Sequence, residues 1–429
     1  MPVSDTKRRF DPLAYRDPAP SAAIIRALGP VNRHLLLRGL LRLKRFEVPP
    51  AEVARLRAAV NPDTVAFLGP NHPEFMTDWL VDKEISRLVS PLMAHWASYE
   101  IVNGSPLSQR FWLANNLIAN VPGGGGKAYS VRWALAGHGV LLHPEGTATW
   151  QADRVGPLLP GIVDLAWEAA AQVRAQGLVR RVFIVPIVWK LHFAGDAAAG
   201  LDAEMGWIER QLGLPRGKGP VESRFAALTR ALLTQRCSHL GLPAPDAAAE
   251  GAGYFVAQAS VAETIRARLA ESHGAFDADP VRAQHQLRRA IRGRAKDDPE
   301  GARRDRALLV ELQRLASFDP ALYDVPSLAQ EQIAETLKRL RTALVTRGAR
   351  NALHNLLPVA VAPRVVHVRV PEPIEVGAAQ LASPDVEGTH AVLLALHRRR
   401  LQEGVDAIRI AIAPVVDRFH RPNPLHSGS

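Results

Sequence analysis

The chain has 429 residues, of which 47% are hydrophobic and 22% are charged, so it can bury a sizeable core and long disordered stretches are not expected. Its formal net charge of +11 favours anionic partners such as nucleic acid, anionic lipid or phosphorylated metabolites. The single cysteine, Cys237, excludes an internal disulfide and a cysteine-based zinc cage, and it suits a reducing compartment. Neither a secretory leader nor a transmembrane helix is expected, because no run of about 18 apolar residues occurs.

Residues 1–50 form a basic segment that carries over half of the net positive charge. A helix is predicted over 21–46, broken by the Gly-Pro pair at 29–30. Beyond the break, leucines gather on one side of the predicted helix, and arginines recur at helical spacing on another. Such a basic amphipathic helix is able to lie in a lipid interface, and equally to pack on the core with a solvated basic face.

Between residues 51 and 199, helical and strand-like stretches alternate, and the strongest strand signal is the apolar run over 182–189. The predicted helices cover 51–60, 73 to about 97, 128–137 and 161–176, and the predicted strands cover 64–68, a stretch ending at 104, 140–143 and 182–189. Strands that alternate with helices predict an α/β fold with a mixed, mostly parallel sheet flanked by helices.

The pattern changes after the predicted α/β core of 51–199. Residues 200–357 are mostly helical and rich in alanine, arginine and leucine, which predicts a helical insertion large enough to fold alone. A clean strand over 365–370 then marks a return to the core over 358–420, with a closing strand and a C-terminal helix. The tail over 421–429 is predicted to be disordered.

A histidine lies where a predicted strand meets a predicted helix, in the string Phe-Leu-Gly-Pro-Asn-His-Pro-Glu-Phe-Met-Thr-Asp over 67–78. Sites in α/β sheets lie beyond the carboxyl ends of strands, and His72 has such a position. Imidazole accepts a proton from a hydroxyl near neutral pH, and a nearby carboxylate fixes its tautomer. Asp78 is the expected partner and Glu74 the alternative. From this spacing alone, a surface-capping histidine is the simpler interpretation.

Two other strings accompany predicted strands. Val-Leu-Leu-His-Pro-Glu-Gly-Thr over 140–147 leaves a strand and begins a loop. Val-Pro-Ile over 185–187 lies within the strongest predicted strand, where a proline costs a ladder hydrogen bond unless the strand lies at an edge or carries a bulge. The proline therefore indicates either a bend beside a site or an edge strand.

Together, and in this order, the three strings resemble the motifs of the glycerophospholipid acyltransferase family. That family carries Asn-His, four residues and Asp, then Phe-Pro-Glu-Gly-Thr-Arg-Ser, then a Val-Pro pair on a strand. The matching strings here begin at Asn71, Leu142 and Val185. With weaker likeness around them, the resemblance covers about 60–195 and 360–375.

The resemblance implies an acyltransferase of phospholipid biosynthesis and lipid metabolism. It would move a fatty acyl group from acyl-CoA or acyl carrier protein to a hydroxyl of a glycerophospholipid-like or other lipid acceptor. His72 would deprotonate that hydroxyl with Asp78 orienting it, and no metal or bound cofactor is implied because the thioester is already activated. The residues that would bind substrate by this likeness are Asn71, Glu145, Gly146 and Thr147. We expect a cytoplasmic protein, peripheral at the inner face of a membrane, with no nucleic-acid partner.

Three departures from the family pattern bear on the partner and the substrate. Five residues separate His72 from Asp78, and one extra residue on a regular helix rotates the carboxylate by about 100°. The dyad therefore needs an irregular first turn, or Asp78 is not the partner. Ala148 stands where the family has arginine, and the family's middle motif with its second arginine is not recognisable over 117–126. The basic residues that could substitute by position are Lys127, Arg132 and Arg154.

Other motifs in the chain do not fit better. The run Gly-Gly-Gly-Gly-Lys over 123–127 lacks the first glycine of a phosphate loop, so a flexible loop is predicted there. The 15 histidines show no compact metal-binding spacing. Two rivals remain: an acyltransferase-like domain without activity, and a nucleic-acid- or partner-binding protein that uses the basic stretch 282–306. Acidic residues interrupt that stretch, which favours a solvated helical face.

Overall fold

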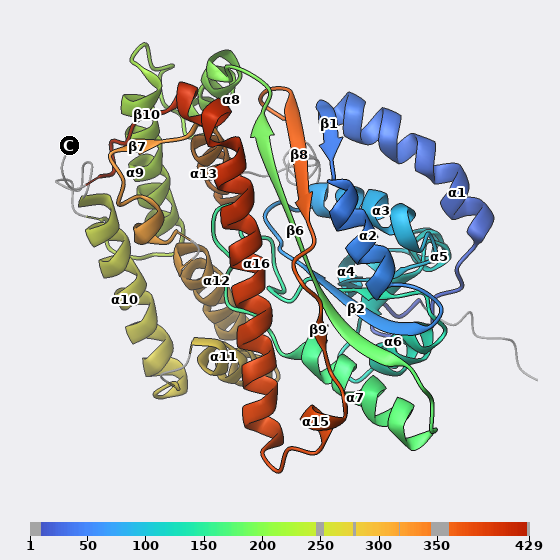
Figure 1. Ribbon diagram of the computed structural model, residues 1–429. Coiled ribbons are helices and arrows are strands. Elements are labelled where there is room, and N and C mark those ends of the chain that lie inside the picture. The colour runs from blue at the N-terminus through green and yellow to red at the C-terminus, as the bar shows by residue number, and fades with distance from the viewer. Residues whose placement is uncertain (1–9, 246–252, 278–279, 317, 345–359, 427–429) are drawn as a thin grey trace, which may run out of the picture. The chain divides into compact units, whose positions relative to one another are not determined.

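The computed structural model describes residues 10–245, 253–277, 280–316, 318–344 and 360–426 (Figure 1). The chain divides into two compact units. The first comprises Met1–Ala194 and Pro358–Pro414, and the second comprises Gly195–Leu357 and Val415–Ser429. The predicted insertion over 200–357 lies inside the second unit, which begins slightly earlier and also takes in the end of the chain.

Within the described residues, the first unit contains an eight-stranded sheet in the order β1-β8-β6-β2-β5-β3-β4, with β9 pairing with β6 beside this path. The strands are β1 (Leu43–Glu47), β2 (Thr64–Pro70), β3 (Ala94–Ser98), β4 (Leu117–Asn120), β5 (Val140–Leu141), β6 (Arg181–Phe193), β8 (Arg364–Arg369) and β9 (Ile374–Glu375). Only the pairings of β6 with β8 and β9 are antiparallel. This confirms the predicted α/β class with a mixed, mostly parallel sheet.

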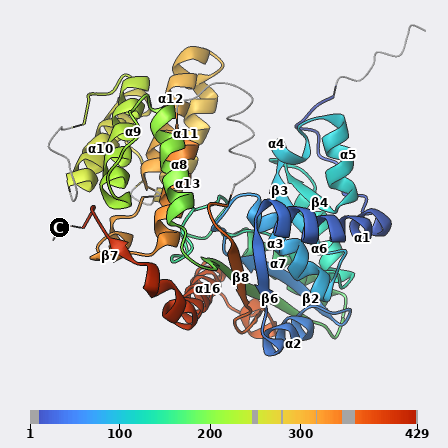
Figure 2. The same cartoon turned by 90° about the horizontal axis from the view of Figure 1, so that it is seen from above.

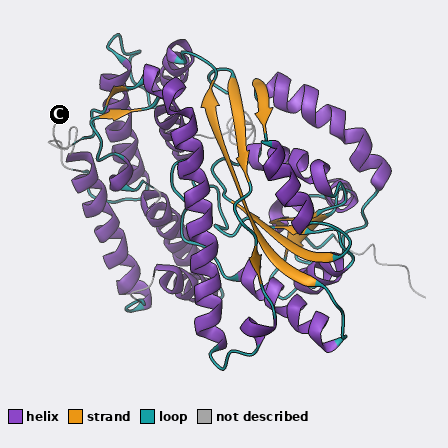
Figure 3. Cartoon of the chain, in the orientation of Figure 1, coloured by secondary structure: helices purple, strands orange, loops and turns teal. Residues whose placement is uncertain are grey.

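The helices of the first unit are α1 (Ala22–Pro30), the π-helix η1 (Val31–Leu40), α2 (Pro50–Ala59), α3 (Thr77–Val89), α4 (Tyr99–Val102), α5 (Pro106–Ala114), α6 (Gly126–Leu135), α7 (Gly161–Ala175), α15 (Ala378–Leu381) and α16 (Val386–Val416). They lie around the orange strands in Figure 3. Among the described residues, no helix has both the length and the apolar content needed to cross a membrane.

The two faces of the sheet bury different side chains because successive residues of a strand point to opposite faces. On β2, Ala66 and Leu68 pack in one core with η1, α2 and α3. The intervening Val65 and Phe67 pack in a second core with α6, α7 and α16. All four side chains are at most 2% exposed, so β2 is buried on both sides, as is typical of a central parallel strand.

The longest strand, β6, changes partners along its length (Figure 1). Residues 181–187 pair with β2, whereas residues 188–193 pair with β8 on the opposite edge. On that edge β9 pairs only with residues 183 and 184, so Pro186 lies between β9 and β8 among the described pairings. Neither β8 nor β9 pairs with residue 186, so the missing N–H of the proline costs no ladder hydrogen bond on that edge. The edge-strand interpretation of the sequence is wrong, since β6 is central.

Several predicted elements differ from those of the structure. The N-terminal helix does not extend over 41–46, because Arg42 has a φ of 53° and the chain then pairs with β8 as β1. The predicted helix over 73–97 is confined to α3, and the residues before 104 form α4 rather than the end of a strand. Arg42 adopts a left-handed conformation that ends a helix, which helical spacing of arginines does not reveal.

The second unit is mostly helical in the described residues. Its elements are α8 (Ala198–Gln211), α9 (Val221–His239), α10 (Gly253–His273), α11 (Pro280–Arg294), α12 (Pro299–Ala316), the 3₁₀ helix η2 (Pro320–Leu322), β7 (Ser327–Leu328), α13 (Gln330–Ala343), the 3₁₀ helix η3 (Asp417–Phe419) and β10 (Arg421–Pro422). Figure 2 shows α8, α9, α10, α12 and α13 next to one another, as their contacts require.

The predicted disordered tail is wrong for its first residues. Strand β10 pairs antiparallel with β7, with Arg421 opposite Leu328. Asn423 is 1% exposed, and its amide donates to the backbone oxygens of Tyr323 and Val325. These hydrogen bonds fix 421–426 to the second unit, and 427–429 lie outside the described residues.

Candidate active site

Asn71 is bound to the sheet directly beyond the end of β2. Its backbone N–H donates to Ile187 O at 3.2 Å, and its side-chain amide donates to Trp189 O and accepts from Trp189 N, both at 3.0 Å. The amide thus bonds to β6 as a backbone peptide group would. The predicted substrate-binding role of Asn71 does not agree with this placement, because both polar atoms of its side chain are used inside the sheet.

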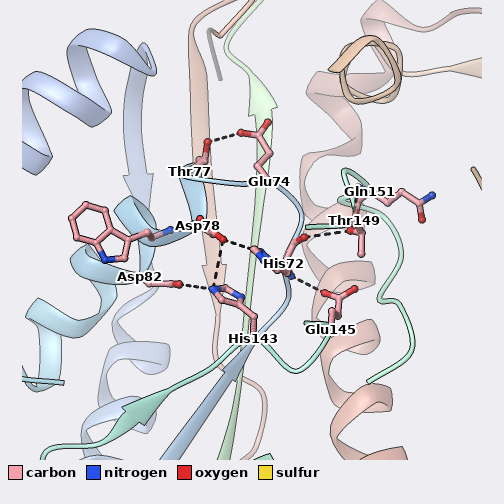
Figure 4. A network of polar contacts seen from close by, with 10 residues as sticks. His72, Glu74, Thr77, Asp78, Asp82, His143, Glu145, Thr149 and Gln151 are labelled. Atoms are coloured by element: carbon pink, nitrogen blue, oxygen red, sulfur yellow. Dashed lines mark hydrogen bonds and ion pairs between the residues drawn. The ribbon is translucent and has the colours of Figure 1, made fainter. Parts of the chain in front are cut away.

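His72 follows this clamp, and a non-helical segment joins it to α3. The segment ends at Met76, which has a φ of 63° and precedes the first helical residue, Thr77. Asp78 lies in the first turn of α3, and its Oδ2 is 2.8 Å from Nδ1 of His72 (Figure 4). The fifth intervening residue is absorbed before the helix starts, so the irregular turn that the spacing requires is present.

A second histidine and a second aspartate belong to the same cluster, and sequence reasoning missed both. The His143 ring stacks on the His72 ring with centroids 4.1 Å apart, and its Nε2 is 2.9 Å from Oδ2 of Asp82. Figure 4 shows the two imidazoles facing the two carboxylates. Asp78 and Asp82 are four residues apart, which puts them on one face of α3. That spacing, together with His143 in place of the motif's phenylalanine, was the signal available in the sequence.

The protonation of this cluster follows from burial and close charges. Burial lowers the pKa of His72, and the neighbouring His143 lowers it further. Burial opposes ionisation of Asp78, yet contact with His72 holds the pKa of Asp78 below its usual value. Burial would likewise lower the pKa of His143, but the Asp82 carboxylate raises it to about 9. Burial raises the pKa of Asp82 as well, but the 2.9 Å contact between Asp82 and His143 favours their ionised forms, so the shifts favour a neutral His72 beside a charged His143 at neutral pH.

Glu145 supports His72 from the opposite side. One carboxylate oxygen accepts from His72 N and the other from Gly156 N, each at 2.7 Å. The backbone N–H of Thr149 donates to His72 O at 2.9 Å. Glu145 is 9% exposed, and burial raises its pKa. The Glu-Gly-Thr loop thus holds the His72 backbone through Glu145, rather than presenting that carboxylate to a substrate.

A cavity of about 670 Å³ opens over the paired imidazoles. Its floor includes His72, Asp78, Asp82 and His143, and its walls are mostly apolar. The wall residues include Phe75, Met76, Trp79, Trp112, Leu142 and Leu159, and the glycine run after β4 closes one side. A concave apolar site with few converging polar groups is the usual form of a small-molecule site.

Of the other predicted site residues, Gly146, Thr147 and Lys127 line the cavity. The Lys127 ammonium is largely exposed and lies 3.3 Å from Asp164 Oδ2. Arg132 points elsewhere: it is paired with Asp17 at 2.7 Å and is not among the cavity's lining residues. Lys127 is therefore the one predicted cation that the structure brings to the cavity in the described part of the chain.

The cluster also contains atoms that metal ions bind. Among the described residues, His72, Asp78 and His143 offer three such atoms within 4.8 Å of one another. The shortest nitrogen–oxygen contacts, 2.8 Å to Asp78 and 2.9 Å to Asp82, are the lengths of direct charge-assisted contacts. As the atoms lie, the cluster consists of two histidine–aspartate pairs in close contact.

The basic stretch 282–306, the candidate for nucleic-acid binding, contains arginines that are paired with acidic residues. Arg294 contacts both Asp298 and Asp305 at 2.7 Å, and Arg303 contacts Glu300 at 3.3 Å. These two arginines are neutralised by carboxylates of α12 and of the turn before it, which favours the solvated-face interpretation.

Comparisons with known proteins add no relative. No protein-family model matches the chain, and no curated protein matches it. A functional argument therefore rests on the geometry of the cavity and on the motif resemblance.

Proposed function

We propose that this protein is an acyltransferase that moves an acyl group from a thioester to a hydroxyl of a lipid acceptor. The observation that carries the proposal is the 2.8 Å contact between His72 and Asp78 at the floor of an apolar-walled cavity. Burial and the His143 cation favour neutral His72 at physiological pH, which is the form that accepts a proton. The same pair serves any reaction that deprotonates a hydroxyl, and the motif resemblance selects acyl transfer.

The proposed reaction proceeds in two steps. Nε2 of His72 takes the proton of the acceptor hydroxyl while its oxygen bonds to the thioester carbonyl carbon, which forms a tetrahedral oxyanion. The oxyanion then collapses, the carbon–sulfur bond breaks, and the leaving thiolate takes the proton from Nε2. Asp78 stays ionised throughout, stabilises the transient imidazolium and fixes the ring through Nδ1. The products are an ester and a free thiol.

A second cavity supports an acyl substrate. It has a volume of about 500 Å³ and lies between α1, η1, α3 and α5. Met76, Trp79 and Trp112 line both this cavity and the one over His72, so the two adjoin through shared apolar walls. An acyl chain whose thioester carbon lies at His72 would have an apolar path into the second cavity.

The charges at the cavity bear on whether the acceptor carries a phosphate group. Among the described lysines and arginines, Lys127 is the one that lines the cavity, and its ammonium is already beside Asp164. We propose that acceptors without phosphate are used at least as well as phosphate-bearing ones, because the two arginines of the resembled motifs have no counterpart at this site.

The direct test measures thiol release and ester formation. The protein is incubated with acyl-CoA of graded chain length and with lysolipids and glycerides that carry or lack phosphate. We expect acceptor-dependent thiol release, with the acylated product seen by mass spectrometry. Background from the protein should be small because its single cysteine is 1% exposed. A preparation that releases no thiol from any donor while it retards nucleic acid in a gel would support the binding-protein rival.

We also propose that the first unit docks on membranes through α1, η1 and α5. Leu35 is 65% and Leu107 79% exposed, and Ile24, Val31 and Phe111 are also exposed on these helices. Arginines 26, 38 and 110 lie on the same elements. Apolar side chains among cations suit an anionic lipid interface. We propose the inner face of a membrane as the location on the ground of the motif resemblance together with these side chains.

The double variant Leu35→Glu with Leu107→Glu should weaken binding to anionic vesicles by about a hundredfold or more, since each buried apolar side chain contributes roughly 1.5 kcal/mol and about 1.4 kcal/mol corresponds to a factor of ten. Co-sedimentation with vesicles of phosphatidylcholine and phosphatidylglycerol measures this. Ile410→Glu, at a residue 70% exposed on α16, is the matched control. Unchanged binding of the double variant would remove these helices from the interface. Deleting 1–46 is a poorer test because Asn32 and Arg33 bind Glu84 and β1 belongs to the sheet.

A further inference from the structure

His143 and Asp82 form a second buried pair that the proposed reaction does not use. His143 comes from the loop after β5, and Asp82 is one turn beyond Asp78 on α3. The Asp82 side chain is 1% exposed and that of His143 is 13% exposed. Placing an imidazole and a carboxylate here costs desolvation, which two apolar side chains would avoid. The pair therefore calls for an explanation beyond packing.

The geometry couples the second pair to the first. The rings of His72 and His143 are stacked with an interplanar angle of 22° and a centroid distance of 4.1 Å. Nε2 of His143 is 2.9 Å from Asp82 and 3.8 Å from Asp78. A charge on His143 thus lies directly against the His72 ring, and both side chains are largely buried. At such distances a cation disfavours a second cation strongly.

We propose that His143, held as a cation by Asp82, is a positioning residue that keeps His72 unprotonated and ready to accept the hydroxyl proton at neutral and mildly acidic pH. The catalytic role of His143 rests on the proposed function. Its effect on the protonation of His72 depends only on the two rings. Asp78 provides the opposing influence, since it favours the imidazolium of His72 once the proton has been transferred. At rest one imidazole of the two pairs, that of His143, is protonated to a cation. During the reaction both imidazoles are cations.

Other titratable groups near the two pairs come from α3, β3, the loop after β5 and α16. Those that act on the cluster are Asp78, Asp82 and Lys83 of α3, His95 of β3, Glu145 of the loop after β5, and Arg398 of α16 through Glu145. Burial lowers the pKa of Lys83 to about 7 and that of His95 well below its usual value. His143 is consequently the group whose cation persists above neutral pH beside His72.

The test replaces His143 by phenylalanine, which keeps a flat ring against His72 and removes the charge. Without that cation His72 protonates more readily, so its pKa rises. The acidic limb of the kcat/KM profile should then move to higher pH by about one unit. Asp82→Asn should shift the limb in the same direction, because His143 then loses its counter-charge and becomes neutral. The double variant should shift no further than either single one.

A direct readout separates this inference from the proposed reaction. The imidazole proton signals of His72 are titrated by NMR in wild-type protein and in His143→Phe, which needs no activity. His138→Phe is the control, since that ring stacks on Trp133 away from the cavity. A higher pKa of His72 in His143→Phe, with the control unchanged, supports the inference even when no acyl transfer is found.

Two results would overturn it. One is a His143→Phe protein whose activity falls while both the acidic limb and the His72 titration stay where they were, which would make His143 a packing residue. The other is loss of wild-type activity on dialysis against a chelator, restored by zinc, which would make the cluster a metal centre.

Discussion

Replacing His72 with alanine is expected to lower kcat/KM for acyl transfer by about a thousandfold or more, since general-base catalysis contributes roughly 10²- to 10⁴-fold. The hydroxyl proton then has no acceptor at the cavity floor. Asp78→Asn should cost about a hundredfold or more, because an amide can stabilise the wrong tautomer of His72 and cannot balance the imidazolium. Thiol release with the best acceptor found for the wild type measures both.

Folding must be shown to survive, because His72 is 9% exposed and its backbone binds Glu145. Circular dichroism and the thermal midpoint of each variant are compared with those of His138→Ala, which removes a histidine outside the cavity. A folded His72→Ala protein that keeps more than a tenth of wild-type kcat/KM would exclude His72 as the base. Wild-type activity should persist below pH 6.5, since burial keeps the His72 pKa below that value.

The largest loss of stability is expected from Arg364→Met. Nη1 of Arg364 on β8 donates to both carboxylate oxygens of Glu74, at 2.8 and 2.9 Å, and Thr77 donates to the same group at 2.7 Å. Arg364 is 4% and Glu74 6% exposed. Removing the Arg364 cation breaks a buried ion pair, which costs about 3–5 kcal/mol. Chemical denaturation, followed by a signal from the first unit and extrapolated to water, measures the loss in free energy of unfolding.

The paired variant Glu74→Met with Arg364→Met separates the buried charge from the packing. It should recover most of the loss, because two apolar side chains avoid the desolvation of both ions. If Arg364→Met alone changes the free energy of unfolding by less than about 1 kcal/mol, the ion pair is exchanging with water and the expectation is wrong. The Glu74 alternative for orienting His72 is also excluded by this geometry, since its carboxylate binds β8 and Thr77.

Strands β2, β5, β6 and β8 were predictable because they carry clear local signals, whereas β1 and β3 lie in stretches that were predicted as helix. The run Val-Phe-Ile-Val-Pro-Ile-Val-Trp can only be buried as a strand, and Val65 to Leu68 are apolar without interruption. Helix ends were less predictable. Arg42 and Met76 adopt positive φ values, and neither residue type announces such a conformation. The two errors at the N-terminus and before α3 both trace to these positions.

The site was half visible in the sequence. His72 and Asp78 are close along the chain, so a pair could be hypothesised from spacing. His143 and Asp82 are 61 residues apart, and only the parallel pairing of β2 with β5 brings their elements together. The scaffold contacts of Asn71 and Glu145 could not be foreseen for the same reason. Their partners, Trp189 and Gly156, are distant in sequence, and only the fold assigns a polar side chain to scaffold or to substrate.

The amide clamp of Asn71 has a consequence for how such sites should be recognised. Because Asn71 fixes the chain to Trp189, the location of His72 is set by β6 and not by the phase of α3. The stretch up to Met76 is then a spacer whose length can vary, provided that Asp78 in the first turn of α3 still contacts the His72 imidazole. A search that demands a fixed histidine-to-aspartate count would discard this chain. A better criterion is an asparagine before the histidine whose amide reaches both backbone groups of one residue on the neighbouring strand.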